Sequence, residues 1–153
     1  MPNTDQDTIF RISNLPSSTG ESSNLKIVEL YMTSHERQRV RRRVVAPDGI
    51  NLALELPTGT MLQVGQVLHK TQNCIYIVQA ATEEVLVMEP RNRKDAARIG
   101  YLVGNLHRDI VIEEEKILTL WDNALAQRLA REEIPVRQEQ RAFTGNAPGE
   151  HSH

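Results

Sequence analysis

The spacing of apolar residues changes near residue 80, and this change constrains the fold more than any other feature of the sequence. Before that point, apolar residues recur at every second position in short segments separated by Pro, Gly, Asn and Asp. After it, two longer segments carry apolar residues at helical spacing. A period of two predicts half-buried strands, and a period of 3.6 predicts amphipathic helices. The sequence therefore predicts an α+β protein with a domain boundary close to residues 80–82.

Short alternating segments fill the first half of the chain, residues 1–80. The clearest pair lies on either side of PDG at 47–49, where Asp-Gly tolerates positive φ and predicts a hairpin. Many short strands with turn residues between them favour a small all-β barrel or sandwich. A polar interruption at 33–38 suggests a short turn. The predicted strands cover residues 9–12, 25–32, 39–46, 50–56, 61–62, 66–70 and 74–79.

The second half, residues 81–143, combines strands with two helices. A continuous apolar run at 85–88 predicts a central strand with both faces covered. Helical spacing predicts helices over 91–107, with Asn92 as N-cap, and over 121–132. Shorter strands are expected at 109–112, 116–120 and 134–141. The resulting order, β-α-β-β-α-β, is the ferredoxin-like arrangement. Residues 144–153, rich in Gly, Asn, Pro, Ser and His, are expected to form a flexible tail.

Gly100, Gly104 and His107 are spaced to share one face over the last two turns of the first predicted helix. Two glycines four residues apart allow another backbone to come close. One interpretation is packing of the helix on its own sheet. The other is a two-fold dimer interface, in which His107 would meet its counterpart in a second chain.

Histidine supplies the candidate metal ligands. His107 is typical either of a helix C-terminus, where it interacts with the last carbonyls, or of a metal ligand. His151 and His153, at the end of the chain, would be recruited as accessory ligands. Imidazole favours Ni²⁺, Cu²⁺ and Zn²⁺ over Mg²⁺ or Ca²⁺. Because only neutral imidazole binds a metal, affinity should fall below about pH 6.5.

A dense basic segment forms the second candidate site. It could contact phosphates or an acidic protein surface, or it could be a solvated strand face balanced by carboxylates. It lacks interleaved aromatic residues, and the second half lacks the aromatic strand of RNA-binding sheets, which weakens the case for a nucleic-acid- or ribosome-associated module. The basic residues are Arg37, Arg39, Arg41, Arg42 and Arg43. In an extended segment all of them except Arg42 share one face.

Composition narrows the functional classes. The net charge of −2 argues against general binding to nucleic acid or membrane surfaces. No secretory signal or membrane-spanning run is recognisable, so a cytoplasmic location is expected. Cys74 is the single cysteine, expected as a small core residue, and His35 and His69 are expected at the surface. No motif for a nucleophile, metalloprotease or phosphate-binding loop is present, which favours a protein that is not an enzyme.

Two motifs in order resemble a known family. The segment LPTGTML at 56–62, followed by GQVL at 65–68, is similar to a turn signature of the UreE family of urease accessory proteins. GNLH at 104–107 resembles the GN-x-H metal motif of that family, and Ala142-Phe143 before a histidine-bearing tail also fits. The resemblance extends from about residue 27 to residue 153.

This resemblance implies a nickel-binding metallochaperone that supplies Ni²⁺ during assembly of the urease active site. It implies a peptide-binding-like N-terminal domain that docks partners, and a ferredoxin-like C-terminal domain that joins a homodimer. His107 carries over as the main ligand, with His151 and His153 as tail ligands, and Zn²⁺ or Cu²⁺ would compete for the site. The implied partners are the urease maturation GTPase and apo-urease. Arg39, Arg41 and Arg43 are then the candidate docking surface.

The chain departs from the family pattern in two places. Some members carry long histidine-rich tails, whereas this chain has two tail histidines, so a carrier of few ions is expected rather than a store. Some members also have histidines near residues 121–123. Here these positions are Trp121, Asp122 and Asn123, which puts a second metal site there in doubt.

Overall fold

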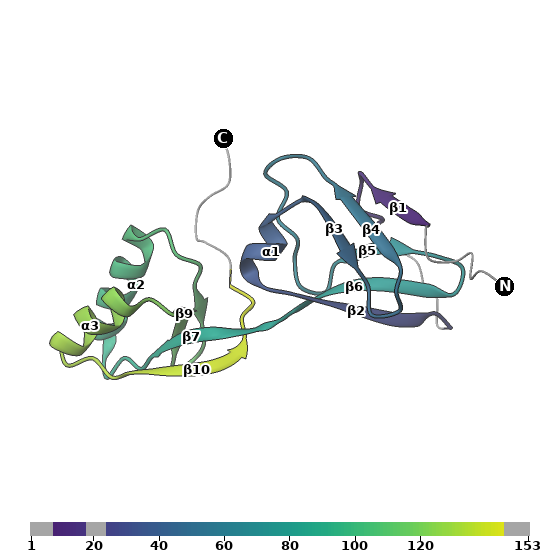
Figure 1. Ribbon diagram of the computed structural model, residues 1–153. Coiled ribbons are helices and arrows are strands. Elements are labelled where there is room, and N and C mark those ends of the chain that lie inside the picture. The colour runs from purple at the N-terminus through teal and green to yellow at the C-terminus, as the bar shows by residue number, and fades with distance from the viewer. Residues whose placement is uncertain (1–7, 18–23, 146–153) are drawn as a thin grey trace. The chain divides into compact units, whose positions relative to one another are not determined.

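A computed structural model describes residues 8–17 and 24–145, and His151 and His153 lie outside these ranges. The chain divides into two compact units, Met1–Ala80 and Ala81–His153, which are described separately below. Both units are built mainly from strands, with three helices among the described residues (Figure 1).

Two three-stranded sheets make up the first unit. One has the order β1-β4-β3 and the other the order β2-β6-β5. A one-turn helix, α1, follows β2 and begins at a capping box in which Thr33 and Glu36 satisfy each other's backbone N–H groups. The elements are β1 (Ile9–Ile12), β2 (Lys26–Met32), α1 (Ser34–Gln38), β3 (Arg41–Val45), β4 (Asn51–Glu55), β5 (Val67–Lys70) and β6 (Cys74–Ala80).

The predicted hairpin at 47–49 is confirmed. β3 and β4 pair antiparallel with Arg42 opposite Leu54, and Gly49 has the positive φ of 88° that this turn requires. Side chains from both sheets then share one core, in which the alternate residues of β2, β4 and β6 are buried. The most deeply buried members are Met32, Leu52, Leu54, Leu56, Leu62, Leu68, Tyr76 and Val78.

Three expectations for this unit were wrong. Residues 61–62 form no strand, because Leu62 is buried in a loop and donates its N–H to the Arg37 carbonyl at 2.9 Å. Arg37 lies in α1 rather than on a strand. It is 3% exposed, and its Nη1 donates to the Met32 carbonyl at 2.7 Å, so it does not share an exposed face with the other arginines. His69 is half-buried rather than at the surface.

A four-stranded antiparallel sheet with the order β10-β7-β9-β8 forms the second unit. The predicted helices and strands are present with shifted ends, and the helix predicted over 91–107 stops two residues early. The elements are β7 (Thr82–Met88), α2 (Arg93–Asn105), β8 (Val111–Ile112), β9 (Ile117–Leu120), α3 (Asn123–Arg131) and β10 (Val136–Ala142).

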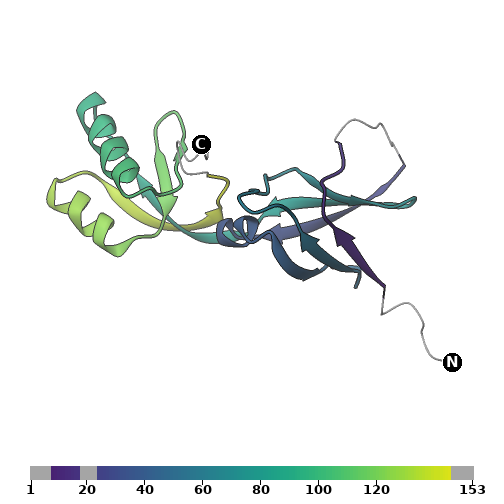
Figure 2. The same cartoon turned by 90° about the horizontal axis from the view of Figure 1, so that it is seen from above.

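Strand β7 has both faces covered, as predicted. Leu86 and Met88 pack into a cluster with residues of α2 and α3, the two neighbouring helices of this unit in Figures 1 and 2. Val85 and Val87 face the opposite side of the sheet and pack with Phe143, which follows β10. Residues 85–88, four of the seven residues of β7, are 0% exposed. The helices therefore cover one face, and the segment after β10 covers part of the other.

His69 lies among aromatic rings in the first unit. Its ring centroid is 4.7 Å from that of Phe10 on β1 and 5.9 Å from that of Tyr76 on β6. Its Nε2 is buried and has no hydrogen-bond partner among the described residues. Burial therefore lowers the pKa of His69 below the usual value of 6.5, because the charged ring would be poorly solvated there.

This environment predicts a pH-dependent stability. Because the folded pKa is lowered, the contribution of neutral His69 is complete above about pH 6.5 and is lost as pH falls below that value toward the folded pKa. Urea unfolding should show a larger loss of stability between about pH 7.5 and about pH 5.5 for the wild type than for His69→Leu. A matched change at the exposed residue, His35→Leu, should leave the wild-type loss intact. An equal loss of stability in the wild type, His69→Leu and His35→Leu would contradict the role given to His69.

Candidate metal centre

Helix α2 carries the candidate metal-binding segment at its C-terminal end. The helix starts at the predicted N-cap: the Asn92 side chain accepts the N–H of Asp95 at 2.9 Å. Asp95 also accepts from the Arg91 guanidinium at 2.7 Å, and this bond holds the Asp95 pKa below its ordinary range. A fixed start and a buried apolar face of Ile99, Leu102 and Val103 set the direction in which α2 ends.

His107 lies just beyond the helix and not on its last turn. Leu106 is the C-cap, and His107 has a φ of 50°, in the left-handed region. Its N–H donates to the Gly104 carbonyl at 3.0 Å, and the Arg108 N–H reaches the Val103 carbonyl at 3.4 Å. These two bonds define a Schellman motif with His107 at the position that glycine usually occupies. The sequence had suggested that His107 shares a helical face with Gly100 and Gly104. This expectation was wrong, because His107 lies beyond the end of the helix.

Two contacts hold the loop that presents His107. Arg108 donates to the Asp122 carboxylate at 2.9 Å, and the buried Thr119 hydroxyl donates to the Asp109 carbonyl at 2.7 Å. Asp122 also accepts the N–H of Leu125 as the N-cap of α3. The imidazole of His107 thus projects from a braced loop and is exposed to solvent.

Gly100 and Gly104 face open space within one chain. A Cβ placed on either glycine would meet no neighbouring atom of the described residues within 4 Å. Helix-on-sheet packing therefore does not explain them, and that interpretation was wrong. The large apolar side chains exposed among the described residues of this unit all lie in one segment around His107: Tyr101, Leu106 and Ile112.

The segment after β10 returns to the His107 loop. Phe143 is 1% exposed on the face of the sheet opposite the helices. A Cβ on Gly145 would lie 2.9 Å from the Ile110 carbonyl oxygen and 2.6 Å from the Phe143 ring, so only glycine fits there. This contact places the last described residue beside Ile110, three positions after His107. In the sequence, Ala142-Phe143 served only for the family resemblance, and this packing was not predicted. The expected tail was wrong at its start, because Gly145 is buried.

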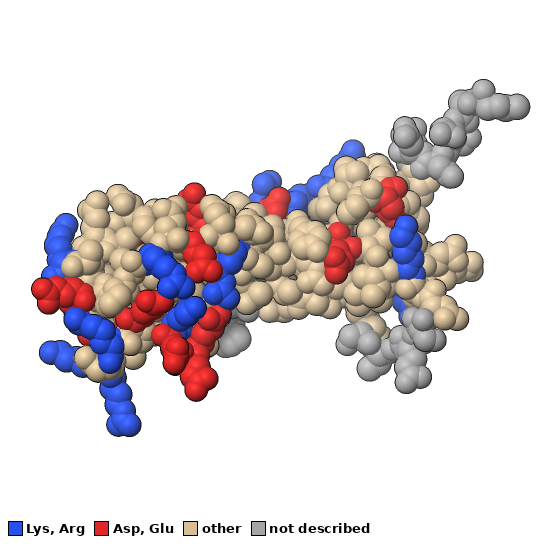
Figure 3. Space-filling model, turned by 90° about the horizontal axis from the view of Figure 1, so that it is seen from below, with Lys and Arg blue, Asp and Glu red and all other residues tan. Residues whose placement is uncertain are grey.

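Arg39, Arg41 and Arg43 are exposed, whereas Arg42 is half-buried and pairs with Glu36 at 3.8 Å. Burial is the main reason that the pKa of Arg42 is lowered. Blue and red side chains are interspersed on the face drawn in Figure 3, without a broad area of one sign. Within residues 8–17 and 24–145, no three His, Cys, Asp or Glu side chains converge as a metal-binding group.

Comparison with known proteins decides the family. Residues 9–81 match the N-terminal domain of the UreE urease accessory protein, and residues 83–153 match its C-terminal domain. The chain belongs to the UreE family. Members of this family are urease accessory proteins rather than enzymes, and a nucleic-acid-binding role finds no support in this membership.

Individual UreE proteins align over most of their length. The chain is 48% identical to the urease accessory protein UreE of Synechococcus sp. (strain JA-3-3Ab) over 134 residues, covering 88% of this chain and 90% of the relative. It is 44% identical to that of Deinococcus radiodurans, covering 81% and 80%. It is 29% identical to that of Geobacillus kaustophilus, covering 75% and 78%. Across the described ranges, the UreE-like chain has no helix with the length and apolar character needed to cross a bilayer.

The left-handed conformation of His107 yields a stability prediction for this UreE-family chain. A residue with a Cβ is disfavoured there, so His107→Gly should raise the free energy of unfolding by up to about 1 kcal/mol. Glu133, with a φ of 59°, ends α3 in the same motif: its N–H donates to the Ala130 carbonyl, and the Ile134 N–H donates to the Leu129 carbonyl. Glu133 is therefore the matched control. Glu133→Gly should stabilise to a similar degree in metal-free urea unfolding. If His107→Gly instead lowers the free energy of unfolding, the His107 side chain stabilises the fold. A functional explanation for histidine at this position would then be unnecessary.

Proposed function

We propose that this protein binds Ni²⁺ at a site built on His107 and delivers the ion for assembly of the urease active site. The placement of His107 carries the proposal. A histidine occupies a position that favours glycine, on a braced loop, with its ring in solvent. A residue kept in a disfavoured backbone conformation supports a functional role when its side chain makes no structural contact that explains it.

A homodimer completes the site in this proposal. Tyr101, Leu106 and Ile112, all within six residues of His107 in the sequence, expose 62%, 47% and 73% of their surface, and exposed apolar side chains of this size support an interface. Gly100 and Gly104 leave room beside them for a second backbone. About a two-fold axis each site residue occurs twice, so two His107 rings could bind one ion. The C-terminal domain would then serve both dimerisation and metal binding.

The tail histidines are proposed as further ligands. Gly145 is held beside Ile110, so the tail starts close to the His107 loop. His151 follows six residues later and His153 eight residues later. At about 3.3–3.6 Å per residue, a six-residue segment spans up to about 20 Å. That reach exceeds the roughly 11 Å that the three residue steps from His107 to Ile110 can span. Both tail histidines can therefore reach the proposed site.

Incomplete protein ligation suits a carrier. Two imidazoles from His107, with tail imidazoles that join and leave, keep coordination positions open for the receiving protein. Such a donor set accepts Zn²⁺ and Cu²⁺ as well as Ni²⁺, so selectivity would depend on geometry and supply. The proposed recipients are the urease maturation GTPase and, through it, apo-urease in the cytoplasm. Arg39, Arg41 and Arg43, exposed on the N-terminal domain, are the proposed docking residues.

The finer architecture is part of the same proposal. The strand order β10-β7-β9-β8, with α2 and α3 packed on one face, supports a ferredoxin-like C-terminal domain. Two three-stranded sheets that share one core support a small sandwich or barrel for the N-terminal domain. The proposed roles follow these parts: partner docking by residues 1–80, metal binding and dimerisation by residues 81–143, and accessory ligation by residues 144–153.

Calorimetric titration with Ni²⁺ tests the metal site. His107→Gly should weaken binding at least about tenfold, since it removes the main ligand without straining the backbone. Glu133→Gly, the matched backbone change, should bind as the wild type does. Truncation after Gly145 should lower affinity or stoichiometry while leaving His107-dependent binding, and wild-type affinity should fall below about pH 6.5. Wild-type nickel binding by His107→Gly would refute the central claim.

Oligomeric state tests the proposed interface. Gly100→Gln with Gly104→Gln introduces side chains that one chain accommodates, because no described residue has an atom within 4 Å of either Cβ. The glutamines should also raise helix propensity by up to about 1 kcal/mol per site, so the monomer should stay folded. Sedimentation should show a monomer for this variant and a dimer for the double alanine variant at the same concentration. A wild-type-like dimer of the glutamine variant would place the interface elsewhere.

A further inference from the structure

Strand β9 of the second unit buries a hydroxyl group at Thr119. This residue is 0% exposed, and its neighbours in the strand, Leu118 and Leu120, are apolar. Thr119 pairs with Leu86 of β7, whose side chain packs with the helices, so Thr119 points to the helix side of the sheet. Valine, which has nearly the same shape, would fill this position without the hydrogen bond that a buried hydroxyl requires.

The Thr119 hydroxyl is used to hold the segment that follows His107. It donates to the Asp109 carbonyl at 2.7 Å, and this carbonyl is its one hydrogen-bond partner among the described residues. Asp109 lies between α2 and β8, two positions after His107. Two residue steps span at most about 7 Å, so the bond fixes the backbone close to the proposed ligand.

The helix side of His107 is held less firmly. One of the two bonds that end α2, from the Arg108 N–H to the Val103 carbonyl, is 3.4 Å long. Most N–H···O bonds measure roughly 2.7–3.2 Å. The corresponding bond of α3, from Ile134 to Leu129, is 3.1 Å, and Ile134 is also buried in the core. The end of α2 therefore depends more on contacts made further along the chain.

Of the two side-chain contacts that hold this loop, only one is buried. Arg108, which pairs with Asp122 at 2.9 Å, exposes 53% of its side chain, so water and salt weaken this ion pair. The Thr119 hydroxyl lies in the apolar interior, where water does not compete for the Asp109 carbonyl. The buried bond is therefore the firmer support of the loop.

We propose that Thr119 is a positioning residue of the metal centre. Its hydroxyl holds the backbone at Asp109, so that His107 presents its imidazole to the ion, and to its counterpart across the two-fold axis, in one fixed direction. Thr119 acts through the backbone and is not itself a ligand. This inference rests on the proposed nickel site at His107 and adds the group that sets the geometry of that site.

Calorimetric titration of the full chain with Ni²⁺ tests the inference. Thr119→Val keeps the shape of the side chain and removes the donor, whereas Thr119→Ser keeps the donor. Loss of a group that supports a metal ligand weakens binding by about 10–100-fold, and Thr119→Val should reach about tenfold because Thr119 acts through two residue steps. Thr119→Ser should bind nearly as the wild type does. All variants are titrated where they are fully folded, so that lost stability alone leaves the affinity unchanged.

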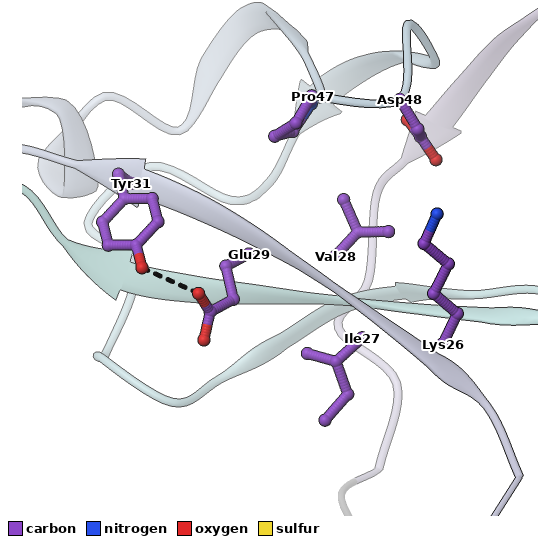
Figure 4. Close-up of a pocket in the computed structure, with 7 residues that line it drawn as sticks. All are labelled: Lys26, Ile27, Val28, Glu29, Tyr31, Pro47 and Asp48. Atoms are coloured by element: carbon purple, nitrogen blue, oxygen red, sulfur yellow. Dashed lines mark hydrogen bonds between the residues drawn. The ribbon is translucent and has the colours of Figure 1, made fainter.

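Tyr76→Phe is the matched control for loss of a buried hydroxyl. Tyr76 is 2% exposed and donates to the Asp48 carboxylate at 2.6 Å. Figure 4 shows this carboxylate beside the hollow between β2 and the turn at 47–49 of the first unit. Tyr76→Phe should lower the free energy of unfolding in urea but leave nickel affinity unchanged. Asp122→Asn, which loses the ion pair with Arg108 and can still cap α3, should weaken nickel binding less than Thr119→Val.

A measurement on the metal-free protein separates positioning from stability. Amide relaxation gives the order parameters of His107 and Arg108, which report how far the loop moves. Thr119→Val should lower both order parameters, and Thr119→Ser should restore the wild-type values. Tyr76→Phe should leave them unchanged, although it also loses a buried hydrogen bond.

Two results would overturn the inference: wild-type nickel affinity in Thr119→Val, or an equal loss of affinity in Thr119→Ser and Thr119→Val. If His107→Gly loses nickel binding and Thr119→Val does not, this inference alone fails. If His107→Gly binds nickel as the wild type does, the proposed site is wrong and the inference fails with it. Should Thr119→Val not fold, Thr119→Ala, which removes the hydroxyl without placing a methyl group at the carbonyl, takes its place in each comparison.

Discussion

The double burial of β7 is the constraint on which the C-terminal unit depends. Its residues at 85–88 contribute to two different apolar clusters, one with the helices and one with Phe143. Ile99, Leu102 and Val103 must face the first cluster, and this fixes the rotation of α2 and the point at which the helix ends. Phe143 must cover the second cluster, and this fixes where the tail leaves the sheet. One strand thus positions both the His107 loop and the start of the tail.

The C-terminal ends of α2 and α3 have the same backbone motif but different side-chain contacts. α2 and α3 both end in a Schellman motif without glycine, with His107 and Glu133 in the left-handed position. In α3, the next residue is Ile134, which is buried and packs with Leu129 in the core. In α2, the next residue is Arg108, which is tied to Asp122. The motif of α2 therefore receives a polar brace where that of α3 has an apolar contact, and this leaves the ring of His107 in solvent.

Much of the fold could be predicted from the sequence because local periodicity determines it. The hairpin at 47–49, the run at 85–88 and the Asn92 cap each depend on neighbouring residues alone, and each was placed correctly. The errors arose where the structure depends on contacts that hydrophobic periodicity does not report. Arg37 is buried because the Met32 carbonyl accepts its side chain, and Leu62 is held in a loop by the Arg37 carbonyl. No local pattern reports either bond, or the rings of Phe10 and Tyr76 beside His69.

For the candidate site, too, the local sequence predicted one part correctly and another part wrongly. The residue type and spacing of GNLH pointed to His107, but a helical projection put its side chain on the wrong surface, since the chain leaves the helix at Leu106. That difference changes the physical picture of metal release. A ligand on a helix face would be tied to helix packing, whereas a ligand just past the helix end can accept or lose an ion without disturbing the buried face of α2. Phe143 and Gly145 hold the start of the tail beside the same loop. The proposed accessory ligands would therefore act at high effective concentration and still be able to separate from His107. In the proposed mechanism, a rigid anchor joined to detachable ligands would let affinity be high during carriage and fall during transfer, because the detachable ligands could be displaced one at a time.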